Sequence, residues 1–388
     1  FTWQHSELVL SRMEHAGWCP SDITMLDKLL TPSGMYFASL LPPRLRQKDH
    51  VAGGCNQEFC NVLNITEAAR LDYCTEHTKD CDKNCGLHYV KEEELCEILS
   101  EEGAIAVVDF LPTGDDHPKL QVSAVTTVNR KPFVAISHVW VEGLGNVRDN
   151  ALPRCQLVRI QALVHQVSGD TSMPFWLDTL CIPQDYSRPH LQAFRINAIK
   201  NMNRVYESSS AVLVLDSELG STSIMASLEE QLVRFACSSW VRRLWTLNEA
   251  VLGTKVMLQL QDGTMDLFVD ILQRLPNHPR FFELSQTLLT ELADFPCRIS
   301  LLRGKEDAPS ITKLWNACQF RSTSEHQDEA MCLAILLGHD PTPIINAGVD
   351  EKWCLFLQAQ KTFPFDLLFT KGPRVELDRY RWAPSSFI

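Results

Sequence analysis

The sequence lacks any run of 18 apolar residues, so no membrane-spanning helix is predicted. Its first 18 residues mix His, Glu and Arg among the apolar positions and lack the apolar centre of a signal peptide, so we expect a cytoplasmic location. Low-complexity tracts and fixed-period repeats are absent, which argues against disordered and solenoid proteins. Positive charge is scarce: the net charge of −12 does not favour binding to a phosphate backbone, and we expect no nucleic-acid partner.

Three regions differ in composition along the 388 residues, a length that allows two or three structural units. Residues 1–125 are rich in Cys and His and are predicted to form a small subdomain that a bound metal ion stabilises. Residues 126–265 alternate short apolar runs with amphipathic segments and are predicted to form an α/β core. Residues 266–388 are predicted to form a mainly helical C-terminal extension.

The alternation in the middle region predicts parallel βαβ units in an open, doubly wound sheet. The predicted strands are Phe133–Trp140, Phe175–Ile182, Ala211–Leu215 and Lys255–Leu260. Helical spacing of apolar residues lies between them, at 154–167, 194–206, 224–236 and 241–252. Ligands of such sheets bind beyond the carboxyl ends of the strands. We therefore expect one rim of the sheet to carry His138, Trp140, Asp178, Cys181 and Asp216.

Four sequence blocks in this region resemble a known family. They are SHVW (137–140), WLDTLCIPQD (176–185), RINAIKNMNRVYESSSAVLVLD (195–216) and RRLWTLNEA (242–250). In this order and spacing they resemble the HET (heterokaryon-incompatibility) domain of fungal proteins, and the blocks at 321–340 and 372–384 resemble the extended form of that family. The resemblance implies a flavodoxin-like or TIR-like fold, and a role in self/non-self recognition and regulated cell death.

A glutamate is the catalytic residue that this resemblance implies. Enzymatic TIR domains, which HET domains resemble in fold, carry it in a Trp-Cys-Leu-x-Glu-Leu helix after the third strand. Here WTLNEA (245–250) occupies the matching place, which implies that Glu249 cleaves NAD. Thr246 and Ala250 depart from the pattern, and the segment 216–240 before the helix is longer. The alternative is that Glu249 pairs with a neighbouring arginine while Trp245 fills the core.

Further residues are candidates for substrate contact or catalysis at the same rim. His138 and Asp178 would orient the ribose or the leaving group, although polar groups at strand ends also satisfy loop amides. An indole would stack on the substrate, and the turn at 143–145 would bring backbone amides to a phosphate. Cys181 would contact substrate or act as a thiol nucleophile, although a cysteine in a buried strand is usually an apolar filler. The predicted substrate-binding residues are Trp140, Gly143, Gly145, Trp245, Arg243 and Cys181.

The N-terminal region offers soft metal ligands at short spacing. Zinc takes four such donors in a closed, tetrahedral structural site. Because the spacing matches no standard zinc finger, the alternative is a set of reduced thiols in a loop-rich region. We predict one structural zinc ion held by four residues, with His50 and Cys74 nearby and the main candidates being Cys55, Cys60, His77, Cys81 and Cys85.

The leading functional hypothesis is hydrolysis of NAD or a related nucleotide at its N-glycosidic bond, with NAD as a substrate and not as a retained cofactor. The main alternative is a non-enzymatic signalling module that self-associates or binds another incompatibility protein. A third is that the scaffold serves another small-molecule reaction. The position of Glu249 distinguishes the first two hypotheses. An enzyme needs this side chain open to a pocket, whereas a signalling module could bury it in a salt bridge.

Overall fold

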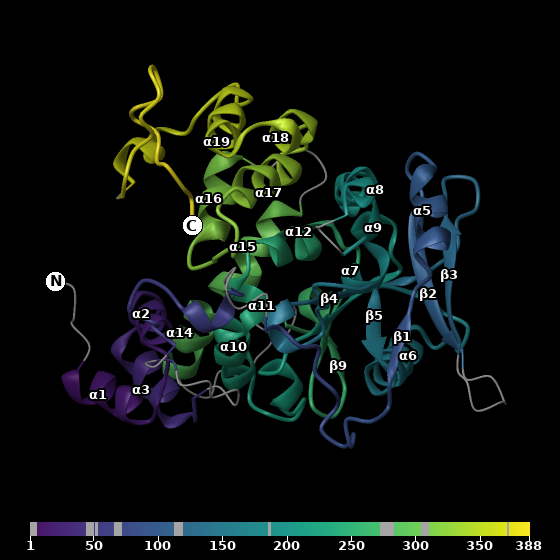
Figure 1. The fold of residues 1–388 in the computed structure, drawn as a ribbon. Helices are drawn as coiled ribbons and strands as arrows, with labels where there is room; N and C mark the ends of the chain where they lie inside the picture. The colour runs from purple at the N-terminus through teal and green to yellow at the C-terminus, as the bar shows by residue number, and fades with distance from the viewer. Residues whose placement is uncertain are drawn as a thin grey trace.

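The structure is a computed structural model, which describes residues 6–43, 50, 53–65, 72–111, 119–184, 188–271, 283–303, 310–370 and 372–388. A group of N-terminal helices lies beside helix α14 of the C-terminal region, which contacts both α3 and α10 (Figure 1). Their bounds are Glu7–His15 for α1, Pro20–Leu29 for α2, Pro32–Leu40 for α3, Leu228–Cys237 for α10 and Glu283–Leu292 for α14.

A seven-stranded mixed sheet forms the centre, in the order β3-β2-β6-β4-β7-β8-β9. Strands β6, β4, β7 and β8, which correspond to the four predicted strands, are parallel. Strands β2, β3 and β9 pair antiparallel at the two sides, so the sheet is mixed and not parallel throughout. The bounds are Ile105–Leu111 (β2), Lys119–Val125 (β3), Val134–His138 (β4), Phe175–Trp176 (β6), Ala211–Leu215 (β7), Val256–Gln259 (β8) and Thr264–Asp266 (β9). Every residue of β4 and β7 is buried, as expected of strands covered on both faces.

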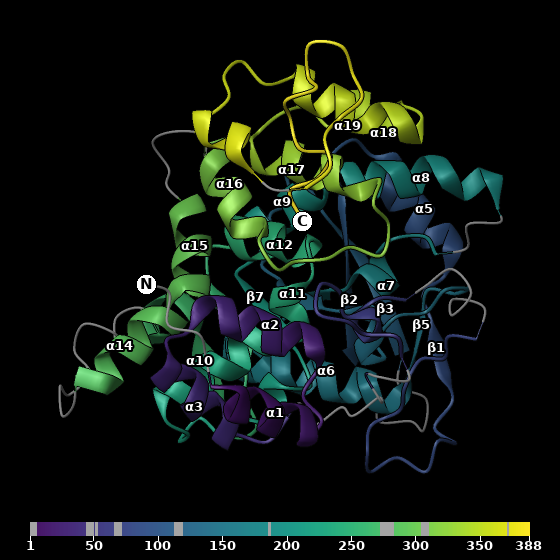
Figure 2. The same ribbon diagram turned by 90° about the vertical axis from the view of Figure 1, so that its left-hand side faces the viewer.

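The connections between the parallel strands reverse direction at β4. The chain passes from β4 outward to β6, and then back across β4 to β7 and β8. Helix α6 (Arg154–Ser168) contacts β2 and β7, whereas α12 (Trp245–Leu252) contacts β4 and α9 (Met202–Ser208). Figures 1 and 2 show α9 and α12 on the opposite side of the sheet from α6. Such a reversal leaves a crevice at the carboxyl ends of the strands.

The predicted strand Phe175–Ile182 was wrong in its second half. Strand β6 ends at Trp176, and a short helix, α7 (Asp178–Cys181), follows. The Asp178 carboxylate accepts a hydrogen bond from the Thr179 amide at 2.6 Å, which satisfies an amide that the helix itself leaves free. The predicted helix 194–206 is likewise divided, into α8 (Pro189–Lys200) and α9.

Elements from outside residues 126–265 complete this centre. Strands β2 and β3 belong to the seven-stranded sheet, and β1 (Leu87–Tyr89) pairs with β5 (Ala151–Pro153) in a separate two-stranded sheet. Helix α5 (Glu92–Ser100) contacts β2, β3 and α8. Helix α11 (Ser239–Arg242) precedes α12, and its first turn is capped by the Ser238 hydroxyl, which accepts from the Val241 amide at 3.2 Å.

The C-terminal region is mainly helical, as predicted. Helix α17 contacts α12 and is buried from Glu329 to Leu336, because DEAMCLAIL is apolar on nearly every face. The helices there are α15 (Asp294–Leu302), α16 (Ile311–Cys318), α17 (Asp328–Leu336), α18 (Thr342–Asn346) and α19 (Val349–Gln358). Across the described residues, no helix has the length and apolar character needed to cross a membrane.

Candidate functional site

A cavity of about 570 Å³ lies at the carboxyl ends of β4 and β6. Its wall combines the end of β4, the start of α7, helices α8, α9 and α12, the segment 323–331, and two residues from the N-terminal region, Leu63 and Ile65. The volume falls within the range of about 300–1,000 Å³ that is usual for small-molecule sites. All three regions distinguished by composition therefore contribute to one site.

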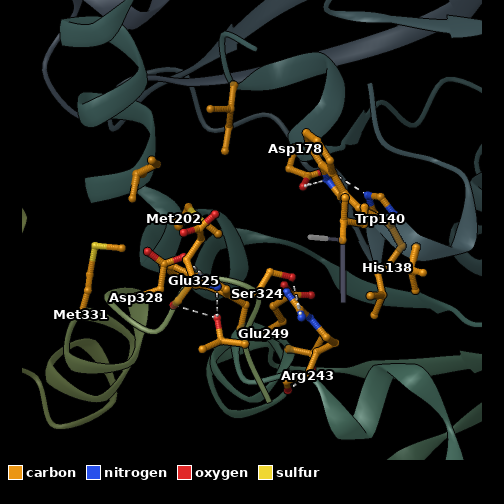
Figure 3. A pocket seen from close by; sticks show the side chains of 18 of the residues that line it. His138, Trp140, Asp178, Met202, Arg243, Glu249, Ser324, Glu325, Asp328 and Met331 are labelled. Carbon is orange, nitrogen blue, oxygen red and sulfur yellow. Dashed lines mark hydrogen bonds and ion pairs between the residues drawn. The ribbon is translucent and has the colours of Figure 1, made fainter. Parts of the chain in front are cut away.

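Most of the predicted site residues line this cavity. Figure 3 shows His138, Trp140 and Asp178 on one side and Asp328 and Met331 on the other. The predicted residues in the wall are His138, Trp140, Asp178, Arg243, Trp245 and Glu249.

Glu249 lies in the second turn of α12, and only 6% of its surface is exposed to solvent. Its carboxylate accepts a hydrogen bond from the Ser137 hydroxyl, which in turn accepts one from Trp240 Nε1 at 2.5 Å. Burial raises the pKa of Glu249 to about 7, although the hydrogen bonds with Ser137 and Tyr206 act in the opposite direction. A buried carboxyl group fixed by a donor chain thus faces the cavity, with both protonation states populated at neutral pH.

The neighbouring arginines are occupied elsewhere, which weighs against the ion-pair interpretation of Glu249. Arg242 pairs with Asp22 at 2.7 Å, and Arg195 donates to the Pro183 carbonyl at 2.7 Å. Arg243 donates to the side chains of Asn64 and Ser324.

His138 and Asp178 form a pair at the ends of β4 and β6. His138 Nε2 lies 2.8 Å from Asp178 Oδ1, and Trp140 Nε1 donates to Asp178 Oδ2 at 2.7 Å. Burial alone would lower the pKa of His138, but the carboxylate of Asp178 raises it above its ordinary value. For Asp178, burial would raise the pKa, and the His138 charge and the Trp140 hydrogen bond instead lower it. Each partner thus favours the charged form of the other, and the Asp178 carboxylate also fixes the Trp140 indole.

Two guanidinium groups, of Arg195 and Arg243, also line the cavity. Burial lowers the pKa of Arg243 to about 10, so this side chain stays positively charged at neutral pH. Trp245 Nε1 donates to Asp328 Oδ2 at 3.0 Å, which orients the second indole of the wall. The cavity therefore presents cations, carboxylates and aromatic faces together.

The turn at 143–145 and Cys181 lie outside the cavity lining. The Gly145 amide, expected to face a phosphate, donates to the Tyr73 hydroxyl at 2.9 Å, and Gly143 has a φ of +89° at the end of the short helix that carries Trp140. The Cys181 thiol is buried, and burial raises its pKa to about 12, which favours the apolar-filler interpretation over a nucleophile.

Gly145→Ala is expected to displace the Trp140 indole. A Cβ at this position would lie 2.6 Å from the ring, so the side chain or the turn must shift. We expect a loss of about 1–3 kcal/mol in the free energy of unfolding, as for overpacking elsewhere, together with a changed tryptophan emission. Urea unfolding followed by fluorescence measures both. Gly220→Ala is the control, because its Cβ would meet no atom within 4 Å beyond its own stretch of chain, and equal effects of the two variants would contradict the proposed packing.

Comparison with known proteins bears on this region of the chain. Residues 133–231 match the family model described as heterokaryon incompatibility protein (HET). The chain carries a HET domain. The match includes His138, Trp140 and Asp178, whereas Glu249 lies beyond its end. No curated protein and no solved structure gives a match.

Cysteine and histidine side chains form two groups of four, which corrects the prediction of one site. The first group is Cys19, His50, Cys55 and Cys60, and the second is His77, Cys81, Cys85 and Cys155. Two of the five predicted ligands, Cys55 and Cys60, belong to the first group, and the other three belong to the second. Each group is completed by a cysteine from elsewhere in the chain, Cys19 in the first and Cys155 in the second. The exposed Cys74 belongs to neither group.

Both groups have the dimensions of a tetrahedral zinc site. Zn–S and Zn–N bonds of about 2.3 and 2.0 Å place two sulfur ligands about 3.8 Å apart, and sulfur and nitrogen about 3.5 Å apart. In the first group, Cys55 Sγ lies 3.7 Å from Cys60 Sγ and 3.5 Å from His50 Nδ1. In the second, His77 Nδ1 lies 3.4, 3.3 and 3.6 Å from the sulfurs of Cys81, Cys85 and Cys155. Either group could hold a metal ion.

Sequence reasoning did not select several residues of the site. Ser137 stands within the SHVW block, where a hydroxyl in a fully buried strand is a signal that a partner lies nearby. Tyr206 was counted only as an apolar member of its helix, although it has a hydrogen bond with Glu249. The 321–340 block, noted for its resemblance alone, supplies the cavity residues Thr323, Ser324, Glu325, Gln327, Asp328 and Met331.

Proposed function

We propose that this HET domain hydrolyses the N-glycosidic bond of NAD or a related nucleotide, in a TIR-like manner, and that the reaction serves heterokaryon incompatibility and regulated cell death. The observation that carries the proposal is that Glu249, the His138–Asp178 pair and two arginines line one cavity. The order of the parallel strands, β6-β4-β7-β8, supports it, since numbered along the chain it is the 2-1-3-4 order of flavodoxin-like sheets. The family match ties the chain to incompatibility.

The reaction needs a group that stabilises positive charge on the ribose. The bond from ribose C1′ to the nicotinamide nitrogen breaks, and the electron pair leaves with nicotinamide, which becomes neutral. Water then attacks C1′ and releases a proton, which gives ADP-ribose. The transition state resembles an oxocarbenium ion, as in glycoside hydrolysis. A carboxylate beside C1′ lowers its energy electrostatically, and no acid is required for a leaving group that is already cationic.

Glu249 is the carboxylate that we assign to this role. Ser137, held by Trp240, donates to the carboxylate and fixes its orientation before substrate binds. Its burial means that the ionised form is poorly solvated, so it gains more from a cationic partner than a carboxylate in water would. The approach of a cationic nicotinamide would itself favour ionisation of Glu249.

The remaining groups of the cavity suit the rest of a dinucleotide. The guanidinium groups of Arg195 and Arg243 can donate to a diphosphate, because the planar arrangement of their N–H donors matches the oxygens of a phosphate. Trp140 and Trp245 offer faces for the aromatic bases. Asp178, held by His138 and by Trp140, can accept from ribose hydroxyls.

We propose in addition that zinc occupies both Cys/His groups as a structural ion. Three thiolates and one imidazole in a closed set of four are the donors that structural zinc prefers.

The test of the proposed function is NAD hydrolysis measured against pH, using concentrated protein and HPLC of the products. Because the active form carries an ionised Glu249 and its pKa is about 7, kcat/KM should rise about tenfold per pH unit below 7 and level off above it. A rate that falls as the pH rises through 7 would contradict the assigned role. The absence of turnover at any pH, including for protein clustered on a surface, would favour the signalling-module alternative.

A further inference from the structure

We infer that the two Cys/His groups fasten two separate parts of the cavity wall, so that loss of metal from either group releases its own part. This inference rests on metal binding to the groups and does not depend on the hydrolytic activity. Each group joins a loop segment to a distant helix: Cys19 directly precedes α2, and Cys155 lies in the first turn of α6.

The second group holds the segment that supports Trp140. His77 follows Glu76, whose amide donates to the Gly143 carbonyl at 2.8 Å and whose carbonyl accepts from Gln156 Nε2 at 2.9 Å. Tyr73 donates to the Trp140 carbonyl at 2.6 Å. The segment bearing His77 thus contacts the turn behind the indole.

Further contacts from the same segment reach the end of that turn. The Thr75 hydroxyl donates to the Gly145 carbonyl at 2.5 Å, and the Tyr73 hydroxyl accepts from the Gly145 amide at 2.9 Å. The Tyr73 and Trp140 rings lie 6.2 Å apart. Displacement of residues 73–77 would therefore remove these contacts with Trp140 and Gly145.

The first group holds the part of the wall next to Arg243. Cys60 begins the short helix Asn61–Leu63, and its carbonyl accepts from the Leu63 amide at 3.3 Å and from Asn64 Nδ2 at 3.4 Å. Leu63 and Ile65 line the cavity, and the Asn64 side chain accepts from Arg243. Metal bound at Cys60 would therefore position both an apolar wall and the partner of a cavity arginine.

Local secondary structure contributes little to holding these segments in place. Residues 72–86 contain no helix or strand, and in 53–65 the only regular element is one turn of 3₁₀ helix. Ordering each residue costs about 1–2 kcal/mol of conformational entropy, and the free energy of zinc binding offsets such costs in small metal-stapled regions. Three sulfurs at tetrahedral spacing would also repel one another if ionised without a cation.

The test combines zinc content with amide hydrogen exchange, and neither readout needs turnover. Wild-type protein should contain two zinc ions per chain, and Cys155→Ser and Cys19→Ser one each. In Cys155→Ser, exchange should increase at least tenfold at residues 73–77 and 140–145 and stay unchanged at 61–65. In Cys19→Ser the pattern should be reversed. Cys74→Ser, an exposed cysteine outside both groups, should match wild type.

If a cysteine variant does not fold, the same question is tested on wild-type protein. Zinc is removed stepwise with a chelator and then added back. Exchange at 140–145 should increase as zinc leaves and decrease again when zinc returns. Two zinc ions in Cys155→Ser, or loss of zinc with unchanged exchange at 140–145 and 61–65, would overturn the inference.

Discussion

Glu249→Gln is expected to lower kcat for NAD hydrolysis at least about 100-fold at pH 8, by analogy with the removal of one preorganised electrostatic group at other active sites. The amide keeps the shape of the carboxyl group and can still accept the hydrogen bond from Ser137. It carries no charge, however, and cannot stabilise the oxocarbenium-like ribose. HPLC of nicotinamide released by matched concentrations of the two proteins measures the effect.

The matched control is Glu207→Gln, the same substitution at an exposed position of α9 next to the buried Tyr206. It should retain the wild-type rate. Equal rates for Glu249→Gln and wild type would remove Glu249 from the mechanism, whatever the products are.

Thermal unfolding should show that Glu249→Gln is folded. The pKa of Glu249 is raised to about 7 in the folded protein, so the neutral carboxyl group favours the folded state at low pH. That contribution is lost as the pH rises from the ordinary carboxyl range through about 7. At pH 8 the glutamine, which cannot ionise, should leave the protein at least as stable as wild type.

Asp22→Asn is expected to lower the free energy of unfolding by about 3–5 kcal/mol, because it leaves a buried guanidinium without its counter-charge. Asp22 on α2 and Arg242 on α11 are buried, and their charged atoms lie 2.7 Å apart. Arg242 Nε also donates to the Phe320 carbonyl at 2.6 Å, and one side chain thus joins the N-terminal helices, the α/β core and the C-terminal region. Urea unfolding measures the loss.

The control for this substitution is Asp378→Asn, which breaks an ion pair with Arg381 whose side chains are 88% and 76% exposed. Water screens such a pair, so no measurable change in stability is expected. If Asp22→Asn were as stable as Asp378→Asn, the buried pair would not be what joins the three regions.

The sequence predicted those parts of the fold that depend on local pattern. Ala211–Leu215 has the predicted bounds, because a short, fully buried strand reads as one uninterrupted apolar run. The segment after Trp176 was mistaken for the same pattern, since four of the six residues in LDTLCI are apolar. The helix α7 that forms there is set by Asp178 and by tertiary packing. The antiparallel strands β2 and β3 join the same sheet although they precede the predicted core.

The position of a residue at the cavity was predictable where that residue sits near a strand end or in a recognisable block. His138 and Asp178 follow from strand ends, and Glu249 follows from the resemblance. The pairing of Cys19 with His50, and of Cys155 with His77, was not predictable, because it depends on how distant segments pack and not on spacing along the chain. The same holds for the residues of α17 that close the cavity.

The most direct measurement of the central claim is mass spectrometry of the products formed from NAD by wild-type protein in H₂¹⁸O. Hydrolysis at the N-glycosidic bond predicts nicotinamide and ADP-ribose in equal amounts, with one ¹⁸O atom on the ribose C1′ of ADP-ribose and none in nicotinamide. Formation of AMP and nicotinamide mononucleotide would show cleavage at the diphosphate and would contradict the account.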